Sequence, residues 1–203
     1  MLADKLGCSH RVRSFWGCFE VDAKVKPDVD AVRASLRNTL RDVPGFPSAE
    51  IVFKDISPLL ARPGALADAV SILEPDVFNL DVEAVLAIDA RGFVLGAAIA
   101  DRLRCGLVMV RKPGKLPGSV DAFDYTCEYC SGRLEVTSGL LHRGLRCLVV
   151  DDVLATGGTA RATADYAASK GGNVVGYAFL LEIEALRGRE KLFEAPVESV
   201  LCC

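Results

Sequence analysis

Apolar runs alternate with polar, glycine-bearing segments along most of the chain. Continuous apolar runs that predict buried strands cover residues 84–88, 106–110, 145–150 and 174–181, and a shorter strand-like segment covers 51–56. Apolar residues at helical spacing predict helices over residues 30–41, 63–73, 93–103, 158–170 and 184–192. Strands that alternate with helices favour an α/β fold, in which a central, mainly parallel sheet is flanked by helices. We expect residues 1–41 to form an N-terminal extension with a helix, and residues 42–203 to form the domain.

One long segment interrupts this alternation. Residues 111 to about 130 contain basic residues, prolines and glycines, and show no buried stripe. We expect a long, mobile loop here, followed by a return strand over 133–136. Long loops in compact domains are usually functional.

The composition limits the class of protein. A chain of 203 residues with 51% hydrophobic and 25% charged residues fits a single globular domain. Its net charge of −3 offers no broad basic surface, so we expect neither nucleic acid nor a membrane as a partner. No stretch approaches the roughly 18 apolar residues of a membrane span, and Met1–Lys5 lacks the apolar core of a signal peptide, so we expect a cytoplasmic protein.

The chain has eight cysteines, and two of them form a C-x-x-C pair, Cys127 and Cys130. A structural zinc site needs a second pair of ligands, and the sequence has only His10 and His142 and no second C-x-x-C. This favours loop thiols over a metal or redox site, although oxidation of the pair stays open.

Charged side chains follow the predicted strands at the points where these end. Asp89 and Arg91 follow the run at 84–88, Arg111 follows the run at 106–110, and Asp151 and Asp152 follow the run at 145–150. Ligands of open α/β sheets lie beyond the carboxyl ends of the strands. These loops therefore predict one site, with cations for a polyphosphate and acids for a sugar and a metal.

The segment from Asp151 to Thr159 is the most specific motif. A small Thr/Gly loop at the start of a helix can offer several backbone N–H groups to a phosphate, and paired carboxylates can accept hydrogen bonds from a diol. No Gly-Lys-Ser/Thr follows, so the loop is not a Walker motif. The segment resembles the phosphoribosyl pyrophosphate signature of the type I phosphoribosyltransferases. The resemblance implies that Asp151 and Asp152 hold the ribose hydroxyls. It also implies a loop that holds the 5′-phosphate, made of Ala155, Thr156, Gly157, Gly158 and Thr159.

Further segments narrow the resemblance to the adenine phosphoribosyltransferases. These are residues 52–58, 89–93, 111–118 and 182–192, and the similarity is collinear from about 42 to 201. It implies a type I phosphoribosyltransferase fold with a flexible hood loop at about 111–132. It implies an enzyme of purine salvage that converts adenine and 5-phosphoribosyl 1-pyrophosphate (PRPP) to AMP and pyrophosphate, with Mg²⁺ as cofactor, as a homodimer. The alternatives are a hypoxanthine, guanine or xanthine phosphoribosyltransferase, or a PRPP-sensing regulator without enzymatic activity.

The same resemblance assigns the pyrophosphate half of the site. Asp89, Ala90 and Arg91 match a loop with a cis peptide, where the family commonly has Ser at the position of Ala90. Arg111 and Lys115 match PRPP-binding positions at the start of the hood, and Arg91 and Arg111 are expected to stabilise the leaving group. Mg²⁺ is expected to bind mainly through PRPP, with Asp151 or Asp152 as the protein's candidate contact. Without the resemblance, a helix cap would be the better interpretation of Asp89–Gly92.

The base and the proton transfer are assigned to other segments. Val52, Phe53 and Lys54 match the adenine-binding segment, and Ile183 matches an apolar residue on the opposite face of the base; core packing would explain Phe53 and Ile183 as well. Glu128 matches the candidate catalytic carboxylate of the hood and Tyr129 a PRPP-binding position, although Cys130 replaces a common Gly. A solvated charge is the alternative for Glu128.

Overall fold

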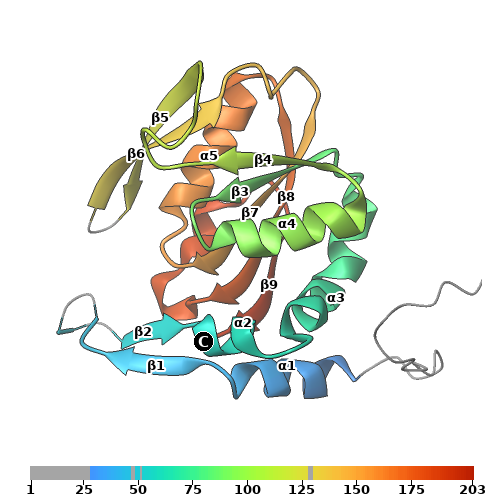
Figure 1. The fold of residues 1–203 in the computed structure, drawn as a ribbon, viewed down its shortest axis with the longest axis vertical. Coiled ribbons are helices and arrows are strands. Elements are labelled where there is room, and N and C mark those ends of the chain that lie inside the picture. The colour runs from blue at the N-terminus through green and yellow to red at the C-terminus, as the bar shows by residue number, and fades with distance from the viewer. Residues whose placement is uncertain (1–27, 47–48, 51, 128–129) are drawn as a thin grey trace, which may run out of the picture.

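The computed structural model describes residues 28–46, 49–50, 52–127 and 130–203. Its centre is a five-stranded sheet in the order β4-β3-β7-β8-β9, in which all neighbouring strands are parallel (Figure 1). The strands are β3 (Ala84–Ile88), β4 (Gly106–Val110), β7 (Arg146–Leu154), β8 (Asn173–Glu182) and β9 (Val197–Cys202). The predicted α/β fold with a mainly parallel sheet is confirmed.

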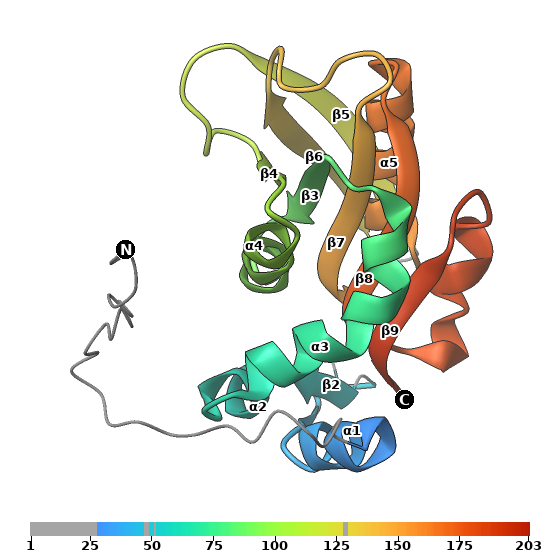
Figure 2. The ribbon, with the colours of Figure 1, turned by 90° about the vertical axis from the view of Figure 1, so that its right-hand side faces the viewer.

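Helices cover both faces of the sheet because alternate residues of each strand point to opposite sides. On β3, Val85 and Ala87 pack with α3 (Ala65–Val77) and α4 (Gly92–Leu103). Leu86 and Ile88 pack with α5 (Gly158–Ser169) on the other face. Figure 2 shows α4 and α5 on opposite sides of the sheet. Both faces of β3 are therefore buried, which explains its unbroken apolar run.

The N-terminal part of the described chain lies against the end of this sheet (Figure 2). Leu36 of α1 (Val29–Arg37) is fully buried, and the Arg37 guanidinium donates to the Cys202 carbonyl at 2.9 Å. The strands β1 (Arg41–Pro44) and β2 (Val52–Asp55) form an antiparallel pair. A short helix that the sequence did not predict, α2 (Ser57–Ala61), follows with proline in its first turn. The domain boundary at residue 41 stays a prediction.

The expectation of a loop over residues 111 to about 130 is wrong from Val120 on, where the chain forms a strand. The strands β5 (Val120–Cys127) and β6 (Cys130–Thr137) pair as an antiparallel hairpin. Leu134 and Val136 are buried, whereas their neighbours are not, and Phe123 stacks on Tyr166 of α5 with the ring centroids 4.6 Å apart. Apolar positions alternate with polar ones in these strands, so the sequence shows no continuous apolar run there.

The C-terminal expectations also need correction. The helix predicted over 184–192 is two short 3₁₀ helices, η2 (Glu184–Leu186) and η3 (Gly188–Lys191), because Arg187 between them is left-handed with φ 53°. The strand β9 was not predicted, and another short 3₁₀ helix, η1 (Phe78–Leu80), follows α3. The strand β7 runs on to Leu154, so the paired aspartates lie inside it. Within the described part of the chain, no helix has the length and apolarity needed to span a membrane.

Candidate active site

The structure brings together the charged residues that follow β3 and β4 and those inside β7. Arg91 Nε lies 2.7 Å from Asp152 Oδ2, which joins the β3 and β7 segments. Arg111 Nε lies 3.2 Å from Asp89 Oδ2, which joins the β4 and β3 segments. The backbone of Asp89 also donates to the Val110 carbonyl at 2.8 Å. Two cations and two acids thus form one continuous polar surface at the carboxyl edge of the sheet.

The loop after β3 leads directly into α4. The Asp89–Ala90 peptide is cis, as the resemblance implied, and α4 begins at Gly92. A Cβ atom on Gly92 would lie 2.8 Å from Asp151 Oδ1 and 2.9 Å from Asp151 Cα. Only glycine therefore lets the start of α4 approach β7 this closely.

The loop after β7 forms a small hollow at the start of α5. The hollow has a volume of about 110 Å³ and is lined by residues from β7, the loop and α5, among them Asp151, Ala155, Thr156, Gly157, Gly158 and Thr159. Gly157 has φ 74°, a conformation that side chains rarely adopt, and α5 begins at the next residue. The start of a twelve-residue helix attracts an anion through its backbone N–H groups and its dipole.

The paired aspartates lie next to each other in an environment that disfavours the charge of Asp151. Asp152 is 7% exposed, and its backbone N–H donates to Asp151 Oδ1 at 2.8 Å. Burial and the adjacent Asp152 carboxylate raise the pKa of Asp151 well above its usual range, and Arg91 offsets this only in part. A diol or a cation would relieve this unfavourable environment.

A metal cage made of protein side chains is not formed here. Among the residues that the structure describes, no group of three or more His, Cys, Asp or Glu side chains is arranged to hold an ion. Two carboxylates with a partly open edge fit an ion that takes most of its oxygens from a phosphorylated ligand and water.

The predicted base-binding residues come from two directions. The Phe53 ring of β2 lies under the Arg91 guanidinium, with 5.2 Å from its carbon to the ring centroid. Val52 is half-exposed, and Lys54 Nζ pairs with Asp42 at 2.9 Å. Ile183 follows β8, and its N–H donates to the Leu154 carbonyl at 2.9 Å. The structure thus places Phe53 beside the cationic loop and Ile183 at the end of β7.

The hood residues are placed in part. The Lys115 carbonyl accepts a hydrogen bond from Arg111 Nη1 at 3.2 Å, and the Lys115 side chain is exposed. Glu128 and Tyr129 lie outside the described residues.

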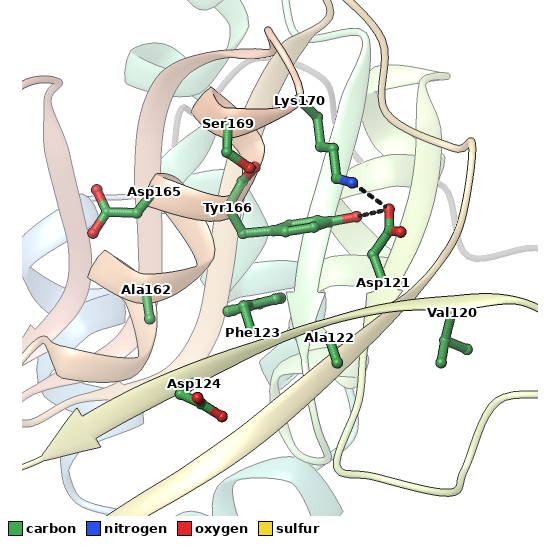
Figure 3. Close-up of a pocket in the computed structure, with 10 residues that line it drawn as sticks. All are labelled: Val120, Asp121, Ala122, Phe123, Asp124, Ala162, Asp165, Tyr166, Ser169 and Lys170. Atoms are coloured by element: carbon green, nitrogen blue, oxygen red, sulfur yellow. Dashed lines mark hydrogen bonds and ion pairs between the residues drawn. The ribbon is translucent and has the colours of Figure 1, made fainter.

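A larger hollow of about 530 Å³ lies elsewhere, between β5 and α5 (Figure 3). None of the predicted site residues lines it. Three of its polar groups are paired with each other, since Asp121 accepts from the Tyr166 hydroxyl at 3.0 Å and pairs with Lys170 Nζ at 2.8 Å. The contacts that line this hollow fix the hairpin to α5, and we do not assign the reaction to it.

Sequence reasoning missed Gly188, which touches the loop of the small hollow, and its neighbour Arg189. A Cβ atom on Gly188 would clash with the Ala155 carbonyl oxygen and lie 2.8 Å from the Gly157 nitrogen, so the η3 backbone packs directly on the loop. The next residue, Arg189, pairs with buried Glu182. The only sequence signal was the Gly-Arg pair inside a segment that looked helical.

Comparison with known proteins agrees with this geometry. Residues 63–199 match the model of the phosphoribosyl transferase domain. The chain is 60% identical over 164 residues to adenine phosphoribosyltransferase 2 of Rhizobium etli, which covers 81% of this chain and 89% of the relative.

Solved structures of adenine phosphoribosyltransferases have a similar fold. The adenine phosphoribosyltransferase of Rhodothermus marinus superposes with a TM-score of 0.80 at 40% identity, covering 86% of this chain and 99% of that one. The Saccharomyces cerevisiae enzyme, solved with an imino-altritol bisphosphate and adenine, gives a TM-score of 0.77 at 32% identity, covering 84% and 99%. The resemblance found in the sequence is confirmed: the chain belongs to the adenine phosphoribosyltransferases, within the phosphoribosyl transferase domain family.

Proposed function

We propose that this site transfers the phosphoribosyl group of PRPP to N9 of adenine and releases pyrophosphate, as a step of purine salvage. The observation that carries the proposal is the convergence of two arginines, two buried acids and a phosphate-sized hollow at one sheet edge. Departure of pyrophosphate leaves positive charge on the anomeric carbon, so the protein must stabilise the leaving group and hold base and sugar in line.

The sugar and its 5′-phosphate bind at the end of β7. Ala155–Thr159 hold the phosphate with backbone N–H groups and the hydroxyls of Thr156 and Thr159, at the start of α5. Asp151 and Asp152 accept hydrogen bonds from the ribose hydroxyls, which relieves the unfavourable burial of the Asp151 carboxylate beside Asp152.

The pyrophosphate binds between β3 and β4. Arg91 and Arg111 exchange their carboxylate partners, Asp152 and Asp89, for phosphate oxygens. Asp151 or Asp152 would be the protein's contact to a bound Mg²⁺, which would supply positive charge against the leaving pyrophosphate.

The base binds between β2 and the end of β8. Phe53 packs on one face of adenine, Ile183 on the other, and the backbone of Val52 and Lys54 reads the base edge. Glu128 in the hood takes the proton that leaves adenine, and Tyr129 and Lys115 close over PRPP. The hood excludes water, which would otherwise hydrolyse the activated sugar.

A substrate panel tests the activity. With Mg²⁺ and PRPP, the protein should form AMP from adenine with a kcat/KM at least about 100-fold above its values for hypoxanthine, guanine and xanthine. Equal use of another purine would overturn the adenine assignment. Glu128→Gln should lower kcat, and full turnover in that variant would remove Glu128 from the mechanism.

We also propose a cytoplasmic homodimer. Cys105, Cys147, Cys202 and Cys203 carry free thiols, as expected in a reducing compartment. For the dimer, β4 is an edge strand of the sheet, and its Leu107 and Met109 are each 42% exposed.

Light scattering tests the dimer contact. Leu107→Lys should shift the protein from dimer to monomer, since it places a charge in the apolar contact. Leu140→Lys, at a residue that is 47% exposed in the loop after β6, is the control and should not. A dimer that survives Leu107→Lys and Met109→Lys together would place the interface elsewhere.

A further inference from the structure

A bidentate ion pair closes the loop between β8 and β9 at its base. Arg189 Nε donates to Glu182 Oε1 at 3.0 Å, and Arg189 Nη2 donates to Glu182 Oε2 at 2.6 Å. The Ser199 hydroxyl donates to Glu182 Oε2 at 2.9 Å, and Arg189 Nη1 donates to the Val197 carbonyl at 2.5 Å. Glu182 is 6% exposed, so its charge depends on these donors.

Both residues of this ion pair are held in their charged forms. The hydrogen bonds from Arg189 lower the pKa of Glu182, and the Glu182 carboxylate raises the pKa of Arg189. Arg189 is thereby fixed to two strands at once, β8 through Glu182 and β9 through Val197. Its planar guanidinium fits this geometry, which a lysine ammonium cannot reproduce.

The closed loop carries a backbone contact to the phosphate-binding segment. Gly188 precedes Arg189 and is buried. Its backbone is so close to Ala155 and Gly157 that a Cβ atom on Gly188 would clash with the Ala155 carbonyl oxygen. The reverse also holds, because a Cβ atom on Gly157 would clash with the Gly188 carbonyl oxygen. The two loops therefore fix each other's position.

We propose that Arg189 is a positioning residue for phosphate binding. Its pair with Glu182 holds the Gly188 backbone against Ala155–Gly157, and this sets the shape of the loop that receives the 5′-phosphate. The inference rests on the proposed role of that loop. Arg189 does not touch the substrate, so its effect is directed at the ribose 5-phosphate half of PRPP and spares the pyrophosphate half.

Ribose 5-phosphate and pyrophosphate each represent one half of PRPP, so their binding tests the two halves of the site separately. In calorimetry, Arg189→Gln should weaken ribose 5-phosphate at least about tenfold and change pyrophosphate binding less than twofold. Arg189→Lys should give an intermediate loss. In kinetics, the KM for PRPP should rise more than kcat falls. Arg102→Gln is the matched control, because Arg102 forms a bidentate pair with Glu74 far from the loop and should leave both ligands unchanged.

A second variant keeps the test independent of folding. Gly188→Ala retains the Arg189–Glu182 pair but pushes on the loop, so it should reproduce the selective loss of ribose 5-phosphate. The clash with backbone atoms should also lower its Tm, so binding is measured below the unfolding transition, and unchanged pyrophosphate binding shows that the rest of the site is folded. Unchanged ribose 5-phosphate binding in Gly188→Ala, or an equal loss of both ligands, would overturn the proposal. Thr159→Val tests the underlying assignment separately: if it binds ribose 5-phosphate as well as the parent does, the loop is not the phosphate site.

Discussion

Replacing Gly92 with alanine tests whether the close approach of α4 to β7 builds the site. The new Cβ would lie 2.8 Å from Asp151 Oδ1, 2.9 Å from Asp151 Cα and 3.0 Å from the Val150 carbonyl oxygen. The last two atoms belong to the backbone, so no side-chain rotation can relieve the contact. Ordinary contact begins at 3.4 Å, and α4 or β7 must therefore move by about half an ångström.

The cost follows from this geometry. Overpacking of this kind costs about 1–3 kcal/mol, and the better helix propensity of alanine returns up to about 1 kcal/mol. We expect a net loss of about 1–2 kcal/mol in the free energy of unfolding. For a chain of this size, that corresponds to a fall of about 2–8 °C in Tm.

Thermal unfolding and steady-state kinetics measure the two consequences. Because Gly92 lies between Arg91 and Asp151, the shift should also raise the KM for PRPP severalfold. Gly106→Ala is the control, since its Cβ would meet nothing closer than 3.4 Å and should change stability by less than about 0.5 kcal/mol. A Gly92→Ala protein with the parent's Tm and KM would refute the reasoning.

Three further predictions concern the base, acid stability and the ion pairs. Phe53→Ala should raise the KM for adenine roughly tenfold in the AMP-forming assay, and an unchanged KM would remove Phe53 from the base site. Hydrogen bonds, chiefly from Ser57, lower the pKa of Asp55 to about 2; this stabilisation is present above about pH 4 and is lost as the pH falls toward 2. Asp55→Asn should therefore destabilise the protein in urea titrations at pH 6 and much less at pH 2, and an equal effect at both would contradict this. Asp152→Asn should tighten pyrophosphate binding, because it frees Arg91, and weaken ribose 5-phosphate binding; calorimetry showing both weakened would argue against partner exchange.

The central strands were predictable because of how they are buried. Residues 84–88 form a strand with the predicted bounds, since a strand covered on both faces gives an unbroken apolar run. Residues 106–110 also form a strand with the predicted bounds, although Leu107 and Met109 of this edge strand are each 42% exposed. The strand β9 contains Glu198 and Ser199 and gave no such run. The false helix at 184–192 has helical spacing, but the Glu182–Arg189 pair folds the chain back and Arg187 breaks the helix. Tertiary contacts overrode local preference there.

For the site, the location of the charged residues was predictable from the sequence, but their pairing was not. The charged residues could be assigned to one edge because the carboxyl ends of parallel strands meet there. Their ion-pair partners could not be assigned from the sequence, since the pairing of Arg91 with Asp152 depends on how α4 crosses β7. The contact of Gly188 with the phosphate-binding loop joins segments about thirty residues apart and leaves no local signal.

The two ion pairs explain how a site with so much charge stays folded without a ligand. Asp152 and Asp89 have side chains only 10% and 9% exposed, and an unpaired carboxylate at that depth would be costly. Arg91 and Arg111 satisfy them, and the same guanidinium groups are the cations that a pyrophosphate needs. Binding of PRPP therefore exchanges partners and buries no new unpaired charge, provided that ribose hydroxyls or Mg²⁺ take over the released carboxylates. It follows that the sugar and pyrophosphate halves of PRPP bind cooperatively, because each half supplies a partner for a group that the other half displaces.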